Sequence, residues 1–340
     1  MSDYDSLTLT TSFPECPDDP SGHFVLSEVR ERARAGGKHV VLAPGPRGIE
    51  FLEVERHLRA ETVQPIEVER LGGKDAFGWP GALTRLRADP LRVLSAVDML
   101  HQMRSRLRVI AARELVAHWL LPCGVLALED GRPSTLWAHG SDVRLLTRSR
   151  VATRGFAERL RRGGAHVVFV ADHLRDAVCE VLPQNLATAL RARSSVRPAP
   201  IELELGSSSL PDLPDGDFIV WAGRFVRAKD PTMAARLAER HHLTLVMLGS
   251  GPIPVACSRF VTRLGQLPRR DALAVIARGC ALVLTSTEEG QSTVAREARG
   301  LGKPVFGLRT RGIEESPDTR LFDSEEELGK ALETFVRRTA

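Results

Sequence analysis

The chain has 340 residues, which predicts two domains, and 43% of them are apolar, which is enough for two hydrophobic cores. Its net charge of +4, from 47 basic and 43 acidic side chains, is too small to indicate a nucleic acid partner. Five scattered cysteines without a C-x-x-C pair exclude a disulfide framework. No signal sequence and no apolar run of about 18 residues is found, so we expect a cytoplasmic protein.

The first elements predict a strand, a helix and a second strand. Leu7–Phe13 is rich in β-formers, His23–Ala35 has apolar residues at helical spacing, and His39–Ala43 is a short buried run. Gly36 directly after the helical segment is a typical helix end. This order is a βαβ unit, which indicates a parallel sheet.

The following segments complete an N-terminal domain that we place at residues 1–198. We expect helices over 81–121 and strands over Pro122–Leu128, Thr135–Ala138 and Val167–Val170. Residues 197–214 contain Pro, Ser and Gly without periodicity, so we place an interdomain linker at 199–216.

A second α/β domain is predicted over residues 217–340. Short apolar runs alternate with helical segments. The expected strands are Phe218–Trp221, Leu243–Leu248, Ala281–Thr285 and Val305–Leu308. Helix starts are expected at Asp230-Pro231, Asp271, Ser292 and Ser324, the last with Glu327 in the capping-box position. The fold class is therefore α/β with two doubly wound parallel sheets, whose ligands bind beyond the carboxyl ends of the strands.

Two cations follow the first strand of the second domain. Arg224 and Lys229 would stabilise the negative charge that develops on a departing diphosphate. Arginine can bind two phosphate oxygens, whereas lysine acts as a point charge. In isolation, the alternative is a pair of solvated loop side chains.

Two carboxylates, Glu289 and Glu297, bracket a predicted helix start. Between them, the backbone N–H groups of Gly290–Thr293 form a potential anion site. The carboxylates would accept hydrogen bonds from sugar and ribose hydroxyls, or they are surface acids that the helix dipole favours. Two cations and two carboxylates at successive strand ends suit a ligand with a pyrophosphate and sugar hydroxyls, such as a nucleotide-sugar.

Four motifs in this domain occur in a fixed order: Gly223-Arg224-Phe225 with Lys229, Gly249-Ser250-Gly251-Pro252, Glu289 with Glu297, and Gly302-Lys303-Pro304-Val305. In this order they resemble the nucleotide-sugar-binding half of the retaining GT-B glycosyltransferases of family 4. The resemblance implies two Rossmann-like domains facing across a cleft. It also implies a donor site formed by Gly22, Gly223, Arg224, Lys229, Gly249, Leu264, Glu289, Gly290, Gln291, Ser292, Thr293 and Glu297.

The N-terminal half resembles the same family in its first loop, Thr11–Val25, and in two histidine motifs. The resemblance implies that His139 lies beside the transferred sugar and joins Arg224, Lys229 and Glu289 as a catalytic residue. It implies an acceptor site with His118, Trp119 and Asp142. The alternatives are half-buried histidines bound to backbone carbonyls and an Asp142 that caps a helix.

The resemblance implies a metal-independent transferase without a cofactor, and the two D-x-D pairs, Asp3 with Asp5 and Asp215 with Asp217, lie in the terminus and the linker. The expected partners are a UDP-sugar or GDP-sugar donor and a small hydroxylated acceptor; lipid or polysaccharide acceptors and a homodimer stay open. The first-domain arginines can attract an anionic acceptor or a membrane surface, but a solvated basic face is commoner. A UDP-GlcNAc 2-epimerase-like enzyme and an inactive GT-B partner protein are the alternative functions.

Overall fold

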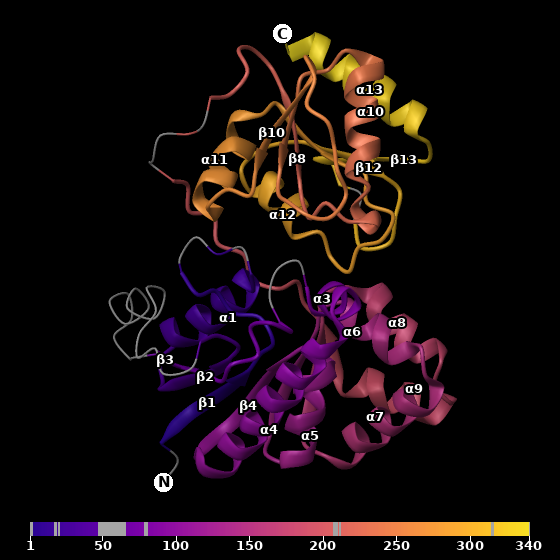
Figure 1. Ribbon diagram of the computed structural model, residues 1–340. Helices are drawn as coiled ribbons and strands as arrows, with labels where there is room; N and C mark the ends of the chain where they lie inside the picture. The colour runs from indigo at the N-terminus through magenta and orange to yellow at the C-terminus, as the bar shows by residue number, and fades with distance from the viewer. Residues whose placement is uncertain are drawn as a thin grey trace. The chain divides into compact units, whose positions relative to one another are not determined.

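The computed structural model (Figure 1) describes residues 3–16, 19, 21–46, 66–77, 81–206, 210, 212–313 and 316–339. The chain divides at Pro200 and Ile201 into two compact units, which we describe separately. Residues 199 and 200 of the expected linker belong to the N-terminal unit, and residues 201–206 belong to the C-terminal unit, where Gly206 N donates to Arg270 O at 3.1 Å.

The N-terminal unit contains one seven-stranded parallel sheet with the strand order β3-β2-β1-β4-β5-β6-β7. Its strands are β1 (Tyr4–Leu9), β2 (His39–Ala43), β3 (Ile66–Arg70), β4 (Ala112–His118), β5 (Ser134–Ala138), β6 (Ala165–Phe169) and β7 (Ser194–Val196). The central strands are nearly continuous apolar runs because helices cover both faces of a parallel sheet.

Ten described helical segments connect these strands. Their bounds are α1 (His23–Arg34), α3 (Ala82–Ala88), η1 (Pro90–Arg92), α4 (Val93–Val109), η2 (Leu120–Gly124), α5 (Val125–Asp130), α6 (Ser141–Thr147), α7 (Arg150–Arg162), α8 (Asp172–Glu180) and α9 (Gln184–Ala192). Helix α1 packs its Val25 and Val29 on Val41 of β2, and most other helices share one larger core.

Two predictions in this unit were wrong. The segment expected to be helical over 81–121 contains strand β4, and the strand expected over Pro122–Leu128 is a π-turn followed by α5. Short apolar runs such as Val125–Leu128 fit a buried strand and a buried helix equally, so periodicity could not distinguish them.

The C-terminal unit contains a six-stranded parallel sheet with the order β10-β9-β8-β11-β12-β13. The strands are β8 (Ile219–Ala222), β9 (Leu245–Leu248), β10 (Val261–Gly265), β11 (Ala281–Leu284), β12 (Val305–Leu308) and β13 (Thr319–Phe322). The helices are η3 (Arg227–Lys229), α10 (Pro231–His241), α11 (Arg269–Arg278), α12 (Thr293–Gly300) and α13 (Glu325–Thr339).

Alternating strand residues build a separate core on each face of this sheet. Ile219 and Trp221 of β8 point toward α10 and α13, whereas Val220 points toward α11 and α12. Figure 1 shows α10 and α13 side by side, as their packing requires. The expected α/β class with two doubly wound parallel sheets is confirmed.

The predicted caps of this unit were largely correct. Asp230 Oδ1 accepts from Met233 N at 3.1 Å, with Pro231 as the first residue of α10. Ser324 Oγ accepts from Glu327 N at 3.2 Å. Asp271 is not a cap, because α11 begins two residues earlier, at Arg269. No helix among the described residues combines the length and the apolarity needed to cross a membrane.

In each sheet, the strand order reverses between two strands whose following loops meet. These strands are β1 and β4 in the N-terminal unit and β8 and β11 in the C-terminal unit. Loops diverge at such a point because their connections run to opposite faces, which creates a crevice for a ligand. Most of the residues expected in the site follow these four strands.

Gly249 controls how closely the loop after β9 approaches the loop after β8. Its φ is +116°, and a Cβ atom there would lie 1.9 Å from Gly223 O. We expect Gly249→Ala to lower the free energy of unfolding of this unit by about 3 kcal/mol or more, because strain and overlap add. Gly265→Ala is the control: its φ is +71° but no atom lies within 4 Å, so a loss of about 1–2 kcal/mol is expected in urea denaturation. Equal losses would contradict the overlap.

Candidate functional site

The loops after β8 and β11 meet in an ion pair between Lys229 and Glu289. Lys229 Nζ contacts Glu289 Oε1, and the side chains are only 20% and 6% exposed. Ser286 Oγ donates to the same carboxylate oxygen at 2.8 Å. Two residues that are 60 positions apart in the sequence, and that were both expected in the site, are therefore in direct contact.

A buried polar chain holds the backbone beneath this ion pair. Trp221 Nε1–H donates to Thr285 Oγ1 at 2.9 Å, and the Thr285 hydroxyl lies 2.8 Å from Asp230 O and 2.9 Å from Lys229 O. In addition, Thr287 N donates to Ala228 O at 3.0 Å. The two loops are thus joined through backbone groups as well as through charges, so the Lys229 ammonium has a defined position.

The other expected donor residues surround this pair. Gly223 and Arg224 directly follow β8, Gly249 follows β9, and Leu264 lies near the end of β10. Gly290 and Gln291 precede α12, which Ser292 caps by accepting from Ala295 N, so the N–H groups of the first turn lie next to Glu289. The backbone at Gly312 packs closely against the loop that contains Glu289, because a Cβ atom at this position would lie 2.6 Å from Glu289 O.

Glu297 lies inside α12 and has a different partner. Its Oε1 accepts from Arg269 Nη1 at 2.6 Å, and Arg269 Nη2 donates to Glu202 O at 2.9 Å. Burial raises the pKa of Glu297 above its ordinary value, while the charge and hydrogen bond of Arg269 oppose that shift. Arg269 was not among the expected site residues.

In the N-terminal unit, the two histidines expected at the acceptor side lie edge to edge with nearly coplanar rings. Their ring centroids are 5.3 Å apart with an interplanar angle of 11°, and His118 Nδ1 lies 3.1 Å from His139 Nε2. Phe24 of α1 packs on His139 at 4.5 Å, and Trp119 lies 5.1 Å from the same ring. Gly22 lets its backbone approach that of Ser12 closely, because a Cβ atom at this position would lie 2.4 Å from Ser12 O.

Glu28 lies behind these histidines and extends them into a row of three groups. His118 Nε2 is 3.6 Å from Glu28 Oε2, and both side chains are almost fully buried. Burial alone would raise the pKa of Glu28, but His118 and Arg32 outweigh it and hold the pKa below its ordinary value. The ionised carboxylate favours a proton on His118 Nε2, and the hydrogen bond on the other side of this ring joins His118 Nδ1 and His139 Nε2.

Because Nε2 of His139 is used in this hydrogen bond, Nδ1 is the ring nitrogen that can hydrogen-bond to a ligand. Burial, and then the nearby His118, lowers the pKa of His139 well below its ordinary value, so its ring is neutral near pH 7. A nitrogen of a neutral imidazole can hydrogen-bond to a hydroxyl group as donor or as acceptor, so this ring suits the recognition of a hydroxyl group.

Asp142 is occupied in holding two loops together. Its Oδ1 accepts from Gly140 N at 2.8 Å and from His139 N at 3.1 Å, and its Oδ2 accepts from Leu120 N at 2.7 Å. The side chain is 3% exposed. In the structure, therefore, its carboxylate positions the backbone of His139 and the segment after Trp119.

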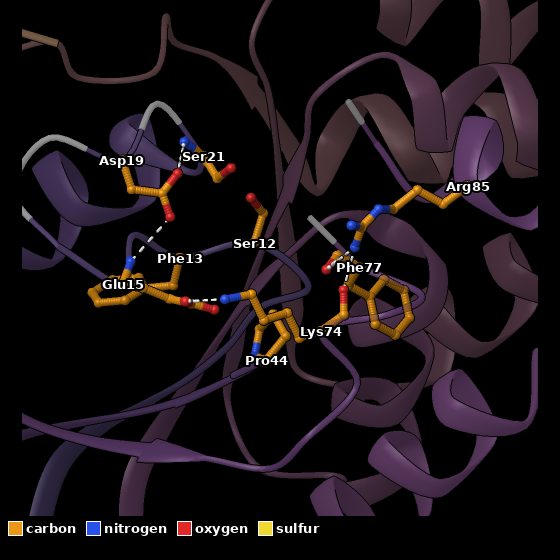
Figure 2. Close-up of a pocket in the computed structure, with 9 residues that line it drawn as sticks. All are labelled: Ser12, Phe13, Glu15, Asp19, Ser21, Pro44, Lys74, Phe77 and Arg85. Carbon is orange, nitrogen blue, oxygen red and sulfur yellow. Dashed lines mark hydrogen bonds and ion pairs between the residues drawn. The ribbon is translucent and has the colours of Figure 1, made fainter. Parts of the chain in front are cut away.

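A pocket of about 190 Å³ lies at the carboxyl ends of β1, β2 and β3 (Figure 2). An ion pair between Lys74 and Glu15 crosses it, and Asp19 holds the first loop by accepting from Glu15 N and Ser21 N. Arg85 donates to the backbone carbonyl of Lys74. The lining residues are Ser12, Phe13, Glu15, Asp19, Ser21, Pro44, Lys74, Phe77 and Arg85. Both signs of charge and the hydroxyls of Ser12 and Ser21 suit a polar ligand the size of a monosaccharide.

Sequence reasoning missed Glu28, Ser286 and Arg269. Glu28 carries a detectable signal, since it is a charged residue on the same face of α1 as Val25 and so interrupts an apolar stripe. Arg269 and Ser286 carry no such signal, because only the folded chain brings them to their carboxylates.

No protein-family model matches the chain. In sequence, the chain is 26% identical over 337 residues to TuaC of Bacillus subtilis, a protein assigned to teichuronic acid biosynthesis as a glycosyltransferase. The alignment covers 90% of this chain and 81% of TuaC.

In structure, the chain is similar to HepE of Anabaena in complex with UDP-glucose. The TM-score is 0.66 at 15% identity over 99% of this chain and 90% of HepE. An Escherichia coli structure described as trehalose-6-phosphate bound with UDP-2-fluoro-glucose has a TM-score of 0.63 at 14% identity, over 97% and 91% of the two chains. The GT-B fold expected from the sequence is therefore confirmed.

Glu28→Gln tests the buried row of charges. We expect it to lower the free energy of unfolding at pH 7 by about 3–5 kcal/mol, because Arg32 and His118 lose a buried partner. Since the pKa of Glu28 is lowered by folding, its contribution is present above its unfolded pKa and is lost as pH falls through the folded pKa. The difference from the wild type should therefore shrink at acid pH in urea denaturation.

Glu114→Gln provides the matched control. Glu114 pairs with the same Arg32, but its side chain is 40% exposed. We expect a loss within about 1 kcal/mol. A pH-independent loss in Glu28→Gln, or a similar loss in both variants, would contradict the role given to Glu28.

Proposed function

We propose that the chain, which has the GT-B fold, is a retaining glycosyltransferase that uses a nucleoside-diphosphate sugar. The transferred group is a hexose or an N-acetylhexosamine, and the acceptor is a hydroxyl of a small molecule. UDP is the favoured nucleotide, since HepE and the Escherichia coli protein are structures with UDP-sugar ligands. GDP is the second candidate.

The observation that carries this proposal is the contact between Lys229 and Glu289 where the strand order of the C-terminal sheet reverses. A diphosphate needs fixed positive charge, and a sugar needs hydrogen-bond acceptors for its hydroxyls. Lys229 and Glu289 provide one of each, side by side. The half-buried Arg224 on the same loop and the N-terminus of α12 add donors for phosphate oxygens.

In the proposed reaction, the bond between the sugar C1 and the β-phosphate oxygen breaks as the acceptor oxygen bonds to C1 on the same face. The acceptor proton passes to an oxygen of the departing diphosphate. Lys229 and Arg224 stabilise the charge on that leaving group more in the transition state than in the ground state. No protein side chain needs to act as a covalent nucleophile.

The N-terminal unit contributes hydroxyl recognition to the proposal. Nδ1 of His139 hydrogen-bonds to a hydroxyl of the transferred sugar, and His118 with Glu28 behind it holds the His139 ring in place. The pocket beside Lys74 supplies the contacts to the acceptor.

Lys229→Ala tests the charge that stabilises the leaving group. We expect sugar transfer, or donor hydrolysis in the absence of an acceptor, to fall about a hundredfold or more in kcat, as for the loss of one charge-stabilising donor. The control is Lys330→Ala, which removes a 68% exposed lysine paired with Glu326 in the same unit and should leave kcat unchanged.

Both variants are first compared with the wild type by circular dichroism and thermal melting, because Lys229→Ala also leaves Glu289 without its cation. A folded Lys229→Ala that keeps near-full turnover would show that the leaving group is stabilised elsewhere.

A thermal-shift comparison of UDP, GDP and their sugars tests the choice of nucleotide. A ligand at a hundred times its Kd stabilises the folded state by about 2.7 kcal/mol, so UDP should raise the Tm by several degrees. We expect GDP to produce a smaller shift at the same concentration. No shift with any nucleoside diphosphate would contradict the proposed donor class.

A further inference from the structure

Helix α11 of the C-terminal unit begins with two arginines, Arg269 and Arg270. The positive end of the helix dipole lies there, so a cation at this end is unfavourable unless a carboxylate compensates it. Arg269 pairs with Glu297 of α12, and its neighbour pairs with Glu204. The two ion pairs lie in different surroundings, which separates the roles of the two arginines.

The ion pair of Arg269 is buried, whereas that of Arg270 is open to solvent. The side chains of Arg269 and Glu297 are 17% and 8% exposed. Those of Arg270 and Glu204 are 41% and 45% exposed, so this pair contributes little to stability. A buried carboxylate that loses its cation is left as an uncompensated charge or takes up a proton. Arg269 therefore determines both the charge and the orientation of Glu297.

Arg269 also binds the segment through which the chain enters the C-terminal unit, residues 201–206, which we name the entry strap. Its Nη2 donates to Glu202 O at 2.9 Å, and its Nη1 donates to Glu297 Oε1 at 2.6 Å. A planar guanidinium that is bound on two sides cannot rotate away from either acceptor without losing a hydrogen bond. The entry strap therefore fixes the cation that faces Glu297.

Further contacts hold the entry strap against the two helices. At α11, Gly206 N donates to Arg270 O at 3.1 Å. At the end of α12, a Cβ atom on Gly300 would lie 2.4 Å from Leu203 Cδ1, so Leu203 packs directly on the helix backbone. The backbone carbonyl that binds Arg269 thus belongs to a segment that is attached at several points.

The buried pair lies at the edge of the C-terminal sheet where most of the expected donor residues are found. Helix α11 follows β10, and α12 follows β11, so both helices begin beyond the carboxyl ends of parallel strands. They cover the same face of the sheet (Figure 1). Glu297 is the fifth residue of α12, about one turn from the helix N-terminus that lies next to Glu289. In doubly wound sheets, ligands bind beyond these strand ends.

We propose that Arg269 is a positioning residue for the nucleotide: bound to the entry strap, it holds the Glu297 carboxylate toward the ribose hydroxyls. Arg269 acts through Glu297 and does not touch the nucleotide. The inference rests on the proposed donor site, because a ribose is the group that Glu297 would bind there. It makes the backbone of the entry strap part of nucleotide recognition, although none of the four donor motifs includes this segment.

The experiment is calorimetric titration of the full chain with UDP and with 2′,3′-dideoxy-UDP, which lacks both ribose hydroxyls. The ratio of the two Kd values measures the ribose preference. Hydrogen bonds to a charged acceptor are among the stronger ones, so we expect the wild type to bind UDP at least about tenfold more tightly. The ratio does not depend on the fraction of folded protein, because unfolding weakens both apparent affinities equally.

Arg269→Gln is the test variant. Of the two arginines that lower the pKa of Glu297, only Arg296 on the same helix then remains, so burial favours the protonated acid more strongly. We expect the ribose preference to fall below about threefold, because Glu297 loses both its charge and its orientation. The matched control is Arg270→Gln, which removes the neighbouring arginine and its exposed contact with the same entry strap and should keep the wild-type preference.

Arg269→Lys is the second variant, for the case that Arg269→Gln does not fold. It retains a buried cation beside Glu297 but not the planar fork that binds two acceptors at once. We expect its ribose preference to be at least about threefold below that of the wild type.

An unchanged ribose preference in Arg269→Gln, or in Arg269→Lys where the first variant does not fold, would overturn the inference. Arg269 would then have a structural role only, even if both nucleotides bound more weakly. An equal loss in Arg270→Gln would overturn it too. A wild type that binds UDP and its dideoxy form equally would overturn this inference and leave the proposed donor class standing. If the wild type bound no nucleoside diphosphate, the donor class would fail as well, so the two failures are distinguishable.

Discussion

The ion pair between Lys229 and Glu289 is the contact on which the C-terminal site depends. It lies where the strand order reverses, and it joins two loops that the sheet alone would leave side by side. Removing two charges from water costs several kcal/mol for each ion, so such a pair is rarely retained for stability alone. A ligand with a phosphate for Lys229 and hydroxyls for Glu289 could bind to both members of the pair. The pair therefore holds both charged groups in place while the site is empty.

The N-terminal unit uses the same topological position for a different purpose. At the reversal between β1 and β4, it places a carboxylate, two hydrogen-bonded imidazoles and a tight first loop. Here the buried charge orients side chains: Glu28 faces His118, and His118 hydrogen-bonds to His139. The reversal of strand order thus places an ion pair in the C-terminal unit and a histidine suited to hydroxyl recognition in the N-terminal unit.

The sequence predicted much of the fold because the signals for it are local. Buried strands, the Asp230-Pro231 helix start and the Ser324 cap depend on neighbouring residues, and all three are found in the structure. The failures have a physical cause as well. Val125–Leu128 forms part of α5 because packing decides whether a short apolar run becomes a strand or a helix. Strand β4 was missed because it lies in a segment rich in arginines, which we interpreted as the solvated face of helices. Contacts such as Glu28 with His118 join residues 90 positions apart, and no local pattern encodes them.

Glu297 shows how the structure adds detail to a motif. The sequence placed it near a ribose, and the structure binds its Oε1 to Arg269. Among the described residues, that ion pair does not involve Oε2, so the carboxylate can hold the arginine with one oxygen and offer the other to a hydroxyl. Burial favours the protonated acid, and Arg269 opposes it. Since only the ionised form has both oxygens available as acceptors, Arg269 would support sugar recognition without touching the sugar.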